Sequence, residues 1–390
     1  MKREQGSTDS PAFSWPTTIA AVLVLFAPIF VLVARGPRET TENRTPTRYV
    51  GRDAGWDYFD AFGDYMADRL PLKTSAIRAD AWVDENVFRE DPAFGGAATP
   101  RVIRGADGFL FLADAVDNAC GPHAPPESTV ANLAELASII EASGREVLTM
   151  VAPDKSSVHP ELLPDDMSKR ECFDAYTAAL WSDLANADID GYVDLRSALI
   201  AASTRSREPL YFRQDTHWDT AGSLVAVQAM VDYLAPGLWT DDEVIYAGLT
   251  RYVGDLAAMQ GTSDEDDTPT YLIGRPDVVN VSVEQLDDLG GGFNRRYISE
   301  APEGRLIEGR TVMFYDSFGI AALHQIVPFF EDLTVIGLTE FDATRYVQQI
   351  EAADRVWIMS VERGLSWRLE NEIGSRDFLD LLRDNLSQRS

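Results

Sequence analysis

Two short stretches, about a hundred residues apart, hold side chains that could carry out acyl transfer. The first covers residues 211–218, where Asp215 stands two residues before His217. In an extended segment the side chains at i and i+2 project to the same side, so this carboxylate could lie beside the imidazole. A carboxylate in that position fixes the tautomer of a histidine and stabilises the imidazolium. The spacing therefore predicts a general base that is oriented by a carboxylate.

The second stretch covers residues 313–319 and supplies a hydroxyl group. Ser317 follows an apolar run at 311–315 and precedes Phe318, Gly319 and further apolar residues. This order predicts a strand, a tight turn and the start of a helix, where a hydroxyl is exposed and backbone N–H groups point outward. Acyl transfer needs a nucleophile, a base, an orienting carboxylate and N–H donors for the oxyanion, and the two stretches together supply them.

Each stretch has an ordinary explanation when it is taken alone. An Asp-x-His sequence is often a loop carboxylate beside a surface histidine, and Asp-Ser after a strand is more often a helix N-cap than a nucleophile. The chain has only four histidines, and one of them lies in the Asp-Thr-His-Trp setting. The acyl-transfer interpretation therefore depends on the two stretches occurring together.

Four stretches of the chain, taken in order, resemble motifs of the alginate O-acetyltransferase family, whose catalytic domain is SGNH-hydrolase-like. They are residues 105–112, 151–164, 215–218 and 316–318. The resemblance runs from about residue 56 to residue 362, in a permuted order in which the acid and base precede the serine. It implies that Ser317, His217 and Asp215 are the catalytic residues.

Two further residues matter for this resemblance. Lys155 belongs to the second motif and follows a predicted strand, so the resemblance implies that it contacts substrate. Tyr315 stands where the simple Gly-Asp-Ser form of the motif has glycine, so the turn before Ser317 must accommodate a side chain.

The resemblance also implies a reaction and its partners. An acetyl group would be carried on Ser317 and then passed to a sugar hydroxyl activated by His217, without a metal or an organic cofactor. The acceptor would be a polysaccharide outside the cytoplasm, and the acetyl donor a multi-pass membrane acyltransferase. Two alternatives remain: a carbohydrate acetyl esterase that uses the same triad with water, and a non-catalytic glycan-binding or assembly protein. The presence of all three triad residues counts against the second alternative.

The composition argues against nucleic acid as a partner in the absence of a local basic groove. Lys and Arg total 34 against 63 Asp and Glu, which gives a formal net charge of -29. Such a surface repels nucleic acid and anionic lipid. The hydrophobic content of 45% is ample for a large core.

The first hundred residues predict a membrane attachment. Residues 17–34 carry no charge and, as a helix, would span about 27 Å, close to the hydrocarbon thickness of a bilayer. We expect a cytoplasmic tail at 1–16, a transmembrane anchor at 17–34, a polar linker at 35–52 and a helical preface at 53–100. A buried core helix is the least favoured interpretation of a terminal run flanked by polar segments, and a cleaved signal peptide is the alternative to the anchor. Either places the rest of the chain outside the cytoplasm, and the anchor makes it a single-pass protein of the cell membrane.

Residues 101–390 predict an α/β fold, an SGNH-hydrolase-like sandwich with a mainly parallel sheet. A hairpin is expected at 101–112. Strands are expected at 146–152, 191–194, 311–315, 333–337 and 355–360, and helices at 127–143, 173–187, 220–234, 317–330 and 344–353. The site should form at the carboxyl ends of the strands. Residues 252–259 resemble a short family helix at the mouth of the active site, and residues 277–293 read either as a sheet edge or as a small subdomain.

The two cysteines, Cys120 and Cys172, predict a disulfide. In an exported protein an even pair is more often a disulfide than two free thiols. Closing this loop of about fifty residues would contribute about 4 kcal/mol in the chain-entropy model. No group of side chains has the spacing of a structural zinc site, so no metal is expected.

Overall fold

The computed structural model describes residues 102–386, apart from 122–123, 208, 261, 263–264, 287–293 and 339–340. The described residues lie within one compact unit, Glu90–Ser390. The predicted tail, anchor, linker and helical preface lie outside the described residues and stay predictions. In the part of the chain that the structure describes, no helix is both long and apolar enough to cross a membrane.

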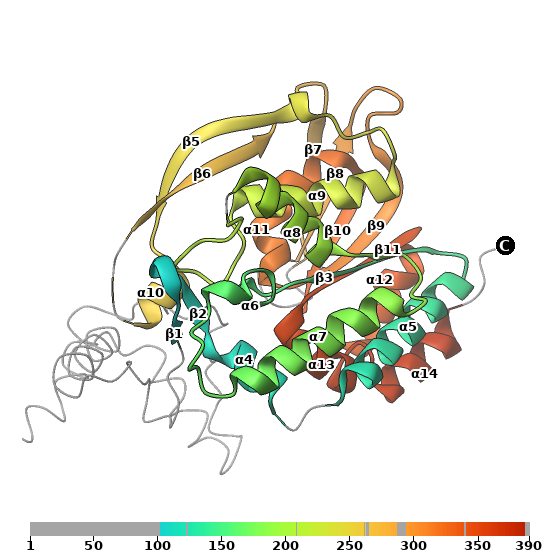
Figure 1. The fold of residues 1–390 in the computed structure, drawn as a ribbon. Helices are drawn as coiled ribbons and strands as arrows, with labels where there is room; N and C mark the ends of the chain where they lie inside the picture. Colours follow the sequence, from blue (N-terminus) through green and yellow to red (C-terminus); the bar gives the residue numbers. More distant parts are fainter. Residues whose placement is uncertain are drawn as a thin grey trace, which may run out of the picture. The chain divides into compact units, whose positions relative to one another are not determined.

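The centre of the fold is a seven-stranded sheet (Figure 1). Its strands, in spatial order, are β4 (Tyr192–Val193), β3 (Glu146–Ala152), β11 (Arg355–Val361), β9 (Ile307–Tyr315), β10 (Phe330–Gly337), β8 (Arg295–Glu300) and β7 (Val279–Gln285). The pairings from β4 to β10 are parallel, whereas β8 and β7 are added antiparallel at one edge.

The sheet is therefore mixed: four of its six strand pairings are parallel, as the expected mainly parallel arrangement has it, and the two pairings at the β8–β7 edge are antiparallel. The physical reason lies in the connections. Parallel neighbours need a crossover, which the chain supplies as helices, whereas β7 and β8 follow one another directly and can pair only as an antiparallel hairpin. The sheet-edge interpretation of residues 277–293 is confirmed for β7, which is the last strand of the sheet.

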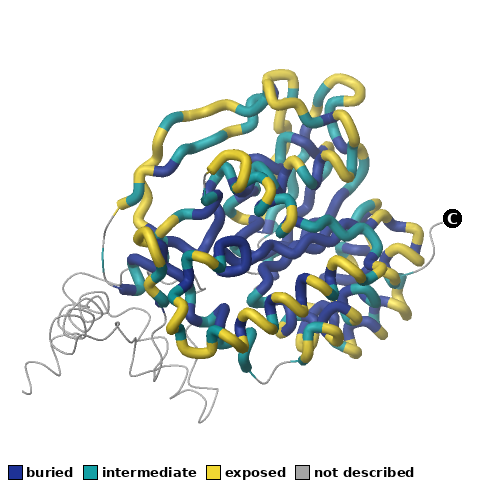
Figure 2. The backbone as a smooth tube through the Cα atoms, in the orientation of Figure 1, coloured by how far each residue is buried: buried dark blue, intermediate teal, exposed yellow. Residues whose placement is uncertain are grey.

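Helices cover both faces of the sheet, and the buried side chains form two separate apolar clusters. In Figure 2 the strands at the centre are coloured mainly as buried, and the surrounding helices carry the exposed positions. On one face lie α5 (Pro126–Ala142), α7 (Arg170–Asn186), α12 (Ala343–Ala352), α13 (Glu362–Asn371) and α14 (Arg376–Asn385). On the other face lie α8 (Leu195–Ser206), α9 (Thr220–Leu234) and α11 (Ser317–Ile326).

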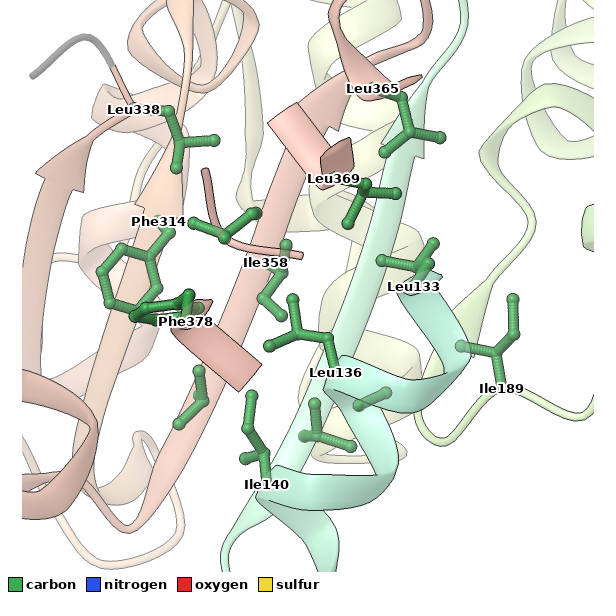
Figure 3. Packing of buried hydrophobic residues seen from close by; sticks show 14 of the residues in the cluster. Leu133, Leu136, Ile140, Ile189, Phe314, Leu338, Ile358, Leu365, Leu369 and Phe378 are labelled. Carbon is green, nitrogen blue, oxygen red and sulfur yellow. The ribbon is translucent and has the colours of Figure 1, made fainter. Parts of the chain in front are cut away.

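Strand β9 shows why a sheet covered on both faces needs continuous apolar runs. Val312 and Phe314 belong to the first cluster, whereas Met313 and Tyr315 belong to the second. Successive side chains of a strand point to opposite faces, so all four positions must be apolar here. Figure 3 shows Phe314 and its neighbour Ile358 of β11 among the helix residues of the first face. This double burial holds the end of β9, and with it Ser317, in a fixed position.

Three smaller elements lie beside the main sheet (Figure 1). The predicted hairpin is confirmed as β1 (Val102–Arg104) and β2 (Leu110–Leu112). A longer ribbon pairs β5 (Val244–Tyr252) with β6 (Asp266–Ile273) and was not predicted. Between the two strands of this ribbon stands the short helix α10 (Asp255–Met259), which confirms a helix in the predicted stretch 252–259.

The predicted disulfide is confirmed. Cys120 follows the short helix α4 (Ala113–Ala119), and Cys172 lies in the first turn of α7. Their Cα atoms are 5.9 Å apart. The bond ties α4, which continues from the β1–β2 hairpin, to the helical layer of the first face.

Candidate active site

The predicted chemical residues gather at the carboxyl ends of the parallel strands, as the topology requires. Ser317 follows β9 directly and is the first residue of α11. Lys155 begins the short helix α6 (Lys155–Val158) just after β3. Asp215 and His217 lie in the loop between α8 and α9.

The loop that carries Asp215 and His217 is compact and not extended, which corrects the assumed geometry. An isolated antiparallel bridge between Tyr211 and Trp218 closes its two ends, and turns and bends fill the space between them. The side chains of Asp215 and His217 still meet, because Asp215 Oδ1 also accepts the backbone N–H of His217 at 2.8 Å. This local turn, typical of aspartate, replaces the extended backbone that the spacing suggested.

His217 is arranged as a general base. Its Nδ1 lies 2.7 Å from Asp215 Oδ1, so the carboxylate holds the proton on Nδ1. The other ring nitrogen, Nε2, is buried and makes no hydrogen bond with any described residue. A buried nitrogen without a partner is costly unless a substrate or a catalytic group supplies one. The lone pair of Nε2 is therefore available to accept a proton.

The charge on Asp215 is secured by its surroundings. Burial opposes ionisation, but the hydrogen bond and the charge of His217, together with backbone N–H donors, outweigh it and lower the pKa of Asp215 to about 2. One of those donors is the N–H of Asp255, 2.8 Å from Asp215 Oδ2. Asp215 is thus ionised throughout the physiological pH range and can stabilise an imidazolium.

Asp255, at the start of α10, is a site residue that the sequence did not single out. Its two carboxylate oxygens accept the backbone N–H of Thr216 at 2.8 Å and the Thr216 hydroxyl at 2.6 Å. Burial, followed by the negative charge of Asp215, raises the pKa of Asp255. Its Oδ2 lies 3.9 Å from His217 Nδ1. Asp255 therefore holds the residue between Asp215 and His217.

Asp215, His217 and Asp255 also offer ligand-type atoms that lie within 4.8 Å of one another. A metal ion would have to compete for these oxygens, since both oxygens of each carboxylate already accept a hydrogen bond. Because these oxygens are already used as hydrogen-bond acceptors, the three residues are better suited to proton transfer by His217 than to binding a metal ion. The expectation of no metal stays a prediction.

Ser317 is placed by its neighbour Asp316. One oxygen of Asp316 accepts the backbone N–H of Phe318 at 3.1 Å, which caps α11, and the other accepts the N–H of Val361 at 2.6 Å, at the end of β11. Arg368 lies 3.3 Å from the second oxygen. Asp316 is therefore the N-cap of α11, which is the ordinary role of an aspartate between a strand and a helix. It also fixes the turn in which the partly exposed Ser317 lies.

The helix of Ser317 packs against the histidine through the next residue. The Phe318 ring lies 5.1 Å from the His217 ring and 5.0 Å from the Trp218 ring, measured between centroids. Within the described residues, the Ser317 hydroxyl and His217 are not joined by a hydrogen bond. Catalytic hydrogen bonds are often long without substrate. The assignment of Ser317 as the nucleophile stays a prediction that this packing favours.

Tyr315 stands where the family motif has glycine, and its side chain occupies space next to Gly319, one helical turn further along the chain. The side chain is fully buried, and a Cβ added at Gly319 would meet Tyr315 atoms at 2.8 Å and 2.9 Å. The glycine at 319 therefore leaves the space that the Tyr315 side chain occupies. A larger residue at 319 would push on the first turn of α11.

Lys155 is buried beneath the catalytic loop. Its Nζ donates to the backbone carbonyl oxygens of Phe212 at 2.9 Å, Arg213 at 3.1 Å and Asp215 at 2.8 Å. The rings of Phe109 and Phe111, from the β1–β2 hairpin, lie 5.5 Å and 5.2 Å from the same atom. All three N–H bonds are used in shaping the loop. The predicted substrate contact stays a prediction, and this geometry favours a positioning role.

A second polar group at the same sheet edge was not predicted. Arg363, just after β11, forms an ion pair with Asp154 and lies over the Phe318 ring, 5.4 Å from its centroid. Beside it, buried Glu362 accepts from Ser157 Oγ at 2.8 Å, from an indole N–H and from the backbone N–H of Asp154 at 3.0 Å. Burial, with the charge of Asp154, raises the pKa of Glu362 to about 7.

Comparison with known proteins places the chain among acetyltransferase-like sequences. Residues 102–289 match the family described as "SGNH hydrolase-like domain, acetyltransferase AlgX". A curated relative, "Probable alginate O-acetylase AlgJ" of Pseudomonas syringae pv. tomato, is 24% identical over 163 residues. That alignment covers 42% of this chain and 39% of the relative, so it spans well under half of the relative's length.

Two solved structures are similar in fold. A DHHW family protein from Eubacterium siraeum is 16% identical, with a TM-score of 0.50, and the match covers 74% of this chain and 100% of that one. The O-acetyltransferase domain of Pseudomonas putida AlgJ is 17% identical, with a TM-score of 0.44, and the match covers 73% of this chain and 99% of that one. The first of these similarities supports the fold assignment and says nothing about substrate.

Proposed function

We propose that the chain, which resembles an alginate O-acetyltransferase-like family over residues 102–289, moves acetyl groups onto hydroxyls of a polysaccharide through an acetyl-serine intermediate on Ser317. The observation that carries the proposal is the state of His217. Its Nδ1 is held by Asp215 at 2.7 Å, and its buried Nε2 has no partner among the described residues. This is the arrangement of a general base that receives its proton from a bound hydroxyl.

In the first half-reaction, His217 Nε2 takes the proton of Ser317 while the serine oxygen attacks the acetyl carbonyl of the donor. The oxyanion that forms needs N–H donors. The N–H of Ser317, at the start of α11, is the one we expect to serve, since the N–H of Phe318 is already bound to Asp316. When the intermediate collapses, the donor oxygen or sulfur leaves with the proton from His217, and acetyl-serine remains.

In the second half-reaction, a sugar hydroxyl replaces the leaving group. His217 takes the proton of this hydroxyl, the sugar oxygen attacks the acetyl carbonyl, and Ser317 recovers its proton as the ester bond to it breaks. Asp215 stabilises the imidazolium in both steps. Water in place of the sugar would give an acetyl esterase, so the choice of acceptor depends on the cleft and not on the triad.

We propose that the reaction takes place outside the cytoplasm, with the chain anchored by residues 17–34 and supplied with acetyl groups by a multi-pass membrane acyltransferase. The disulfide between Cys120 and Cys172 supports an exported protein, because disulfides persist in oxidising compartments. Accessibility of the described domain to protease added to intact cells tests the location. Full protection in intact cells, with digestion after lysis, would contradict it.

The triad is tested with purified Ser317→Ala and a small chromogenic acetate. We expect loss of acetate release with an unchanged unfolding transition, and an acetyl adduct on Ser317 in the parent protein by mass spectrometry. Ser206→Ala, at an exposed position on α8, serves as the control and should turn over normally. Normal turnover by Ser317→Ala would remove the nucleophile assignment.

A further inference from the structure

A small cavity lies next to the site on the first helical face. Its volume is about 180 Å³, and α4, α7 and α13 surround it. These three helices lie side by side near the carboxyl edge of the sheet (Figure 1). The cavity is lined by the aromatic rings of Phe173, Tyr176 and Trp367. It is also lined by polar groups of Asn118, Asp154 and Arg363. Neither the triad nor its supporting residues use this space.

Arg363 connects the cavity to the catalytic serine. Its side chain lines the cavity and also lies over the Phe318 ring, which follows Ser317 directly. The backbone carbonyl of Arg363 accepts the side-chain N–H of Asn118 at 3.1 Å, which fixes α4 against α13. Two side chains, Arg363 and Phe318, therefore link the cavity to the residue that would carry the acetyl group.

The size and lining of the cavity fit one sugar ring. Pockets for drug-sized ligands hold roughly 300–1,000 Å³, so this one suits a smaller unit. Trp367 is 53% exposed, although an indole of this size is usually covered. An exposed indole offers a flat apolar face at low conformational cost, and carbohydrate rings present a face of C–H groups to such surfaces. Asn118 and Asp154 add groups that can pair with hydroxyls.

The charged residues that line the cavity favour a neutral sugar over an acidic one. Among the described lining residues, Arg363 alone carries a positive charge, and Asp154 forms an ion pair with it. Glu362 adds a further carboxyl group, and the whole chain carries a formal net charge of -29. The carboxylate of an acidic sugar would meet no unpaired cation here and would be repelled at longer range.

We infer that the cavity at Trp367 is an acceptor subsite that binds a neutral pyranose unit of the glycan, next to the unit that is acetylated. This inference rests on the proposed function, since it assumes that a glycan reaches Ser317. Trp367 would stack on the ring, and Asn118 and the Asp154–Arg363 pair would hold its hydroxyls.

The test compares Trp367→Ala and Trp367→Phe with a matched control, Tyr233→Ala. Tyr233 is 44% exposed, but it lies on α9 on the opposite face of the sheet. Each variant is measured for hydrolysis of a small chromogenic acetate, which does not need the subsite. Each is also combined with Ser317→Ala and titrated with neutral gluco-, manno- and galacto-tetrasaccharides and with a mannuronate tetrasaccharide, up to about 10 mM, by calorimetry.

We expect at least one neutral tetrasaccharide to bind Ser317→Ala, and Trp367→Ala to weaken that binding about tenfold. Trp367→Phe should retain most of the affinity, Tyr233→Ala should retain all of it, and acetate hydrolysis should be unchanged in every variant that keeps Ser317. The subsite is wrong if no neutral tetrasaccharide binds, if mannuronate binds more tightly, or if Trp367→Ala behaves like Tyr233→Ala. The proposed function fails separately, through normal acetate hydrolysis by Ser317→Ala.

Discussion

Asp215 and Asp255 each hold the segment that carries the other. The backbone N–H of Asp255 donates to Asp215 Oδ2 at 2.8 Å, and the carboxylate of Asp255 accepts both donors of Thr216, the residue after Asp215. The first contact caps α10, and the second clamps the catalytic loop. The two carboxylates therefore form one unit, in which Asp215 orients His217 and Asp255 positions the loop that carries them both.

Asp255→Ala should lower kcat on a small acetate by about tenfold to a hundredfold with little change in KM, because misplacing a catalytic group by about 1 Å can cost that much. The kcat of Asp255→Asn, which keeps one acceptor oxygen, should lie between that of Asp255→Ala and that of the parent. Asp267→Ala is the control, since this carboxylate is exposed on β6 and pairs with Arg251.

The pH profile separates positioning from general stability. Because burial and Asp215 raise the pKa of Asp255, the parent should lose its clamp on Thr216 as the pH falls, above the range of an ordinary carboxyl group. Asp255→Asn should lack this acidic decline. Identical pH profiles for parent and variant would leave Asp255 with a purely structural role.

Asp215→Asn should cost far more activity than Asp255→Asn. The same change in a serine protease lowers kcat about 10⁴-fold, because the histidine loses its orienting charge. Asp219→Asn is the matched control: Asp219 is buried in the same loop and caps α9, and asparagine caps a helix as well as aspartate does. Near-normal acetate turnover by Asp215→Asn would leave at most a Ser-His pair.

The same carboxylate makes stability depend on pH. The pKa of Asp215 is lowered from 3.8 to about 2, so the folded chain binds this proton less readily than the unfolded chain. The resulting stabilisation, about 2 kcal/mol, is present above about pH 4 and is lost as the pH falls toward 2. The difference in free energy of unfolding between parent and Asp215→Asn should therefore shrink in acid. A constant difference would contradict the assignment.

Removing the disulfide tests its contribution to stability. The bond joins residues 52 positions apart, so the Cys120→Ser, Cys172→Ser double variant should lose about 4 kcal/mol of stability in the chain-entropy model. Acetate turnover should change little at low temperature, since neither cysteine touches the triad. Thiol reagent added to the denatured, unreduced parent should modify neither cysteine, and two labels per chain would contradict the bond.

The bounds of strands buried on both faces of the sheet, and of amphipathic helices, could be predicted from the sequence. Strand β3 at Glu146–Ala152 and helix α9 at Thr220–Leu234 have the expected bounds, because burial imposes a clear apolar pattern on each. The ribbon of β5 and β6 was missed, since most residues of β5 are exposed and show no such pattern. Strand β7 is exposed along its whole length, so its sequence pattern does not distinguish a sheet edge from a small subdomain.

The site was predictable only where its chemistry is local in the sequence. Asp215 and His217 stand two residues apart, so their contact could be expected. Asp255 lies forty positions from Asp215, and Arg363 lies 209 positions from Asp154. Only the folded chain brings such pairs together, and a lone Asp or Arg has no spacing that marks it.

Lys155 gives the last test, because its ammonium group lies under the carbonyls of the catalytic loop. Burial lowers its pKa to about 7, against the opposing charges of Asp215 and other carboxylates. Between about pH 7 and 10.5 the unfolded chain therefore binds a proton that the folded chain does not, and stability from this group should rise with pH across that window.

We expect this rise in urea denaturation of the parent at pH 7 to 9 and its absence in Lys155→Met. Lys169→Met, which removes an exposed lysine paired with Asp117, should keep the slope of the parent. Lys155→Met should also lose acetate turnover, since three carbonyl oxygens lose their donor and the loop of His217 loosens. If turnover of the small acetate stayed normal while transfer to a glycan was lost, the substrate contact predicted for Lys155 would be correct and the positioning role would be wrong.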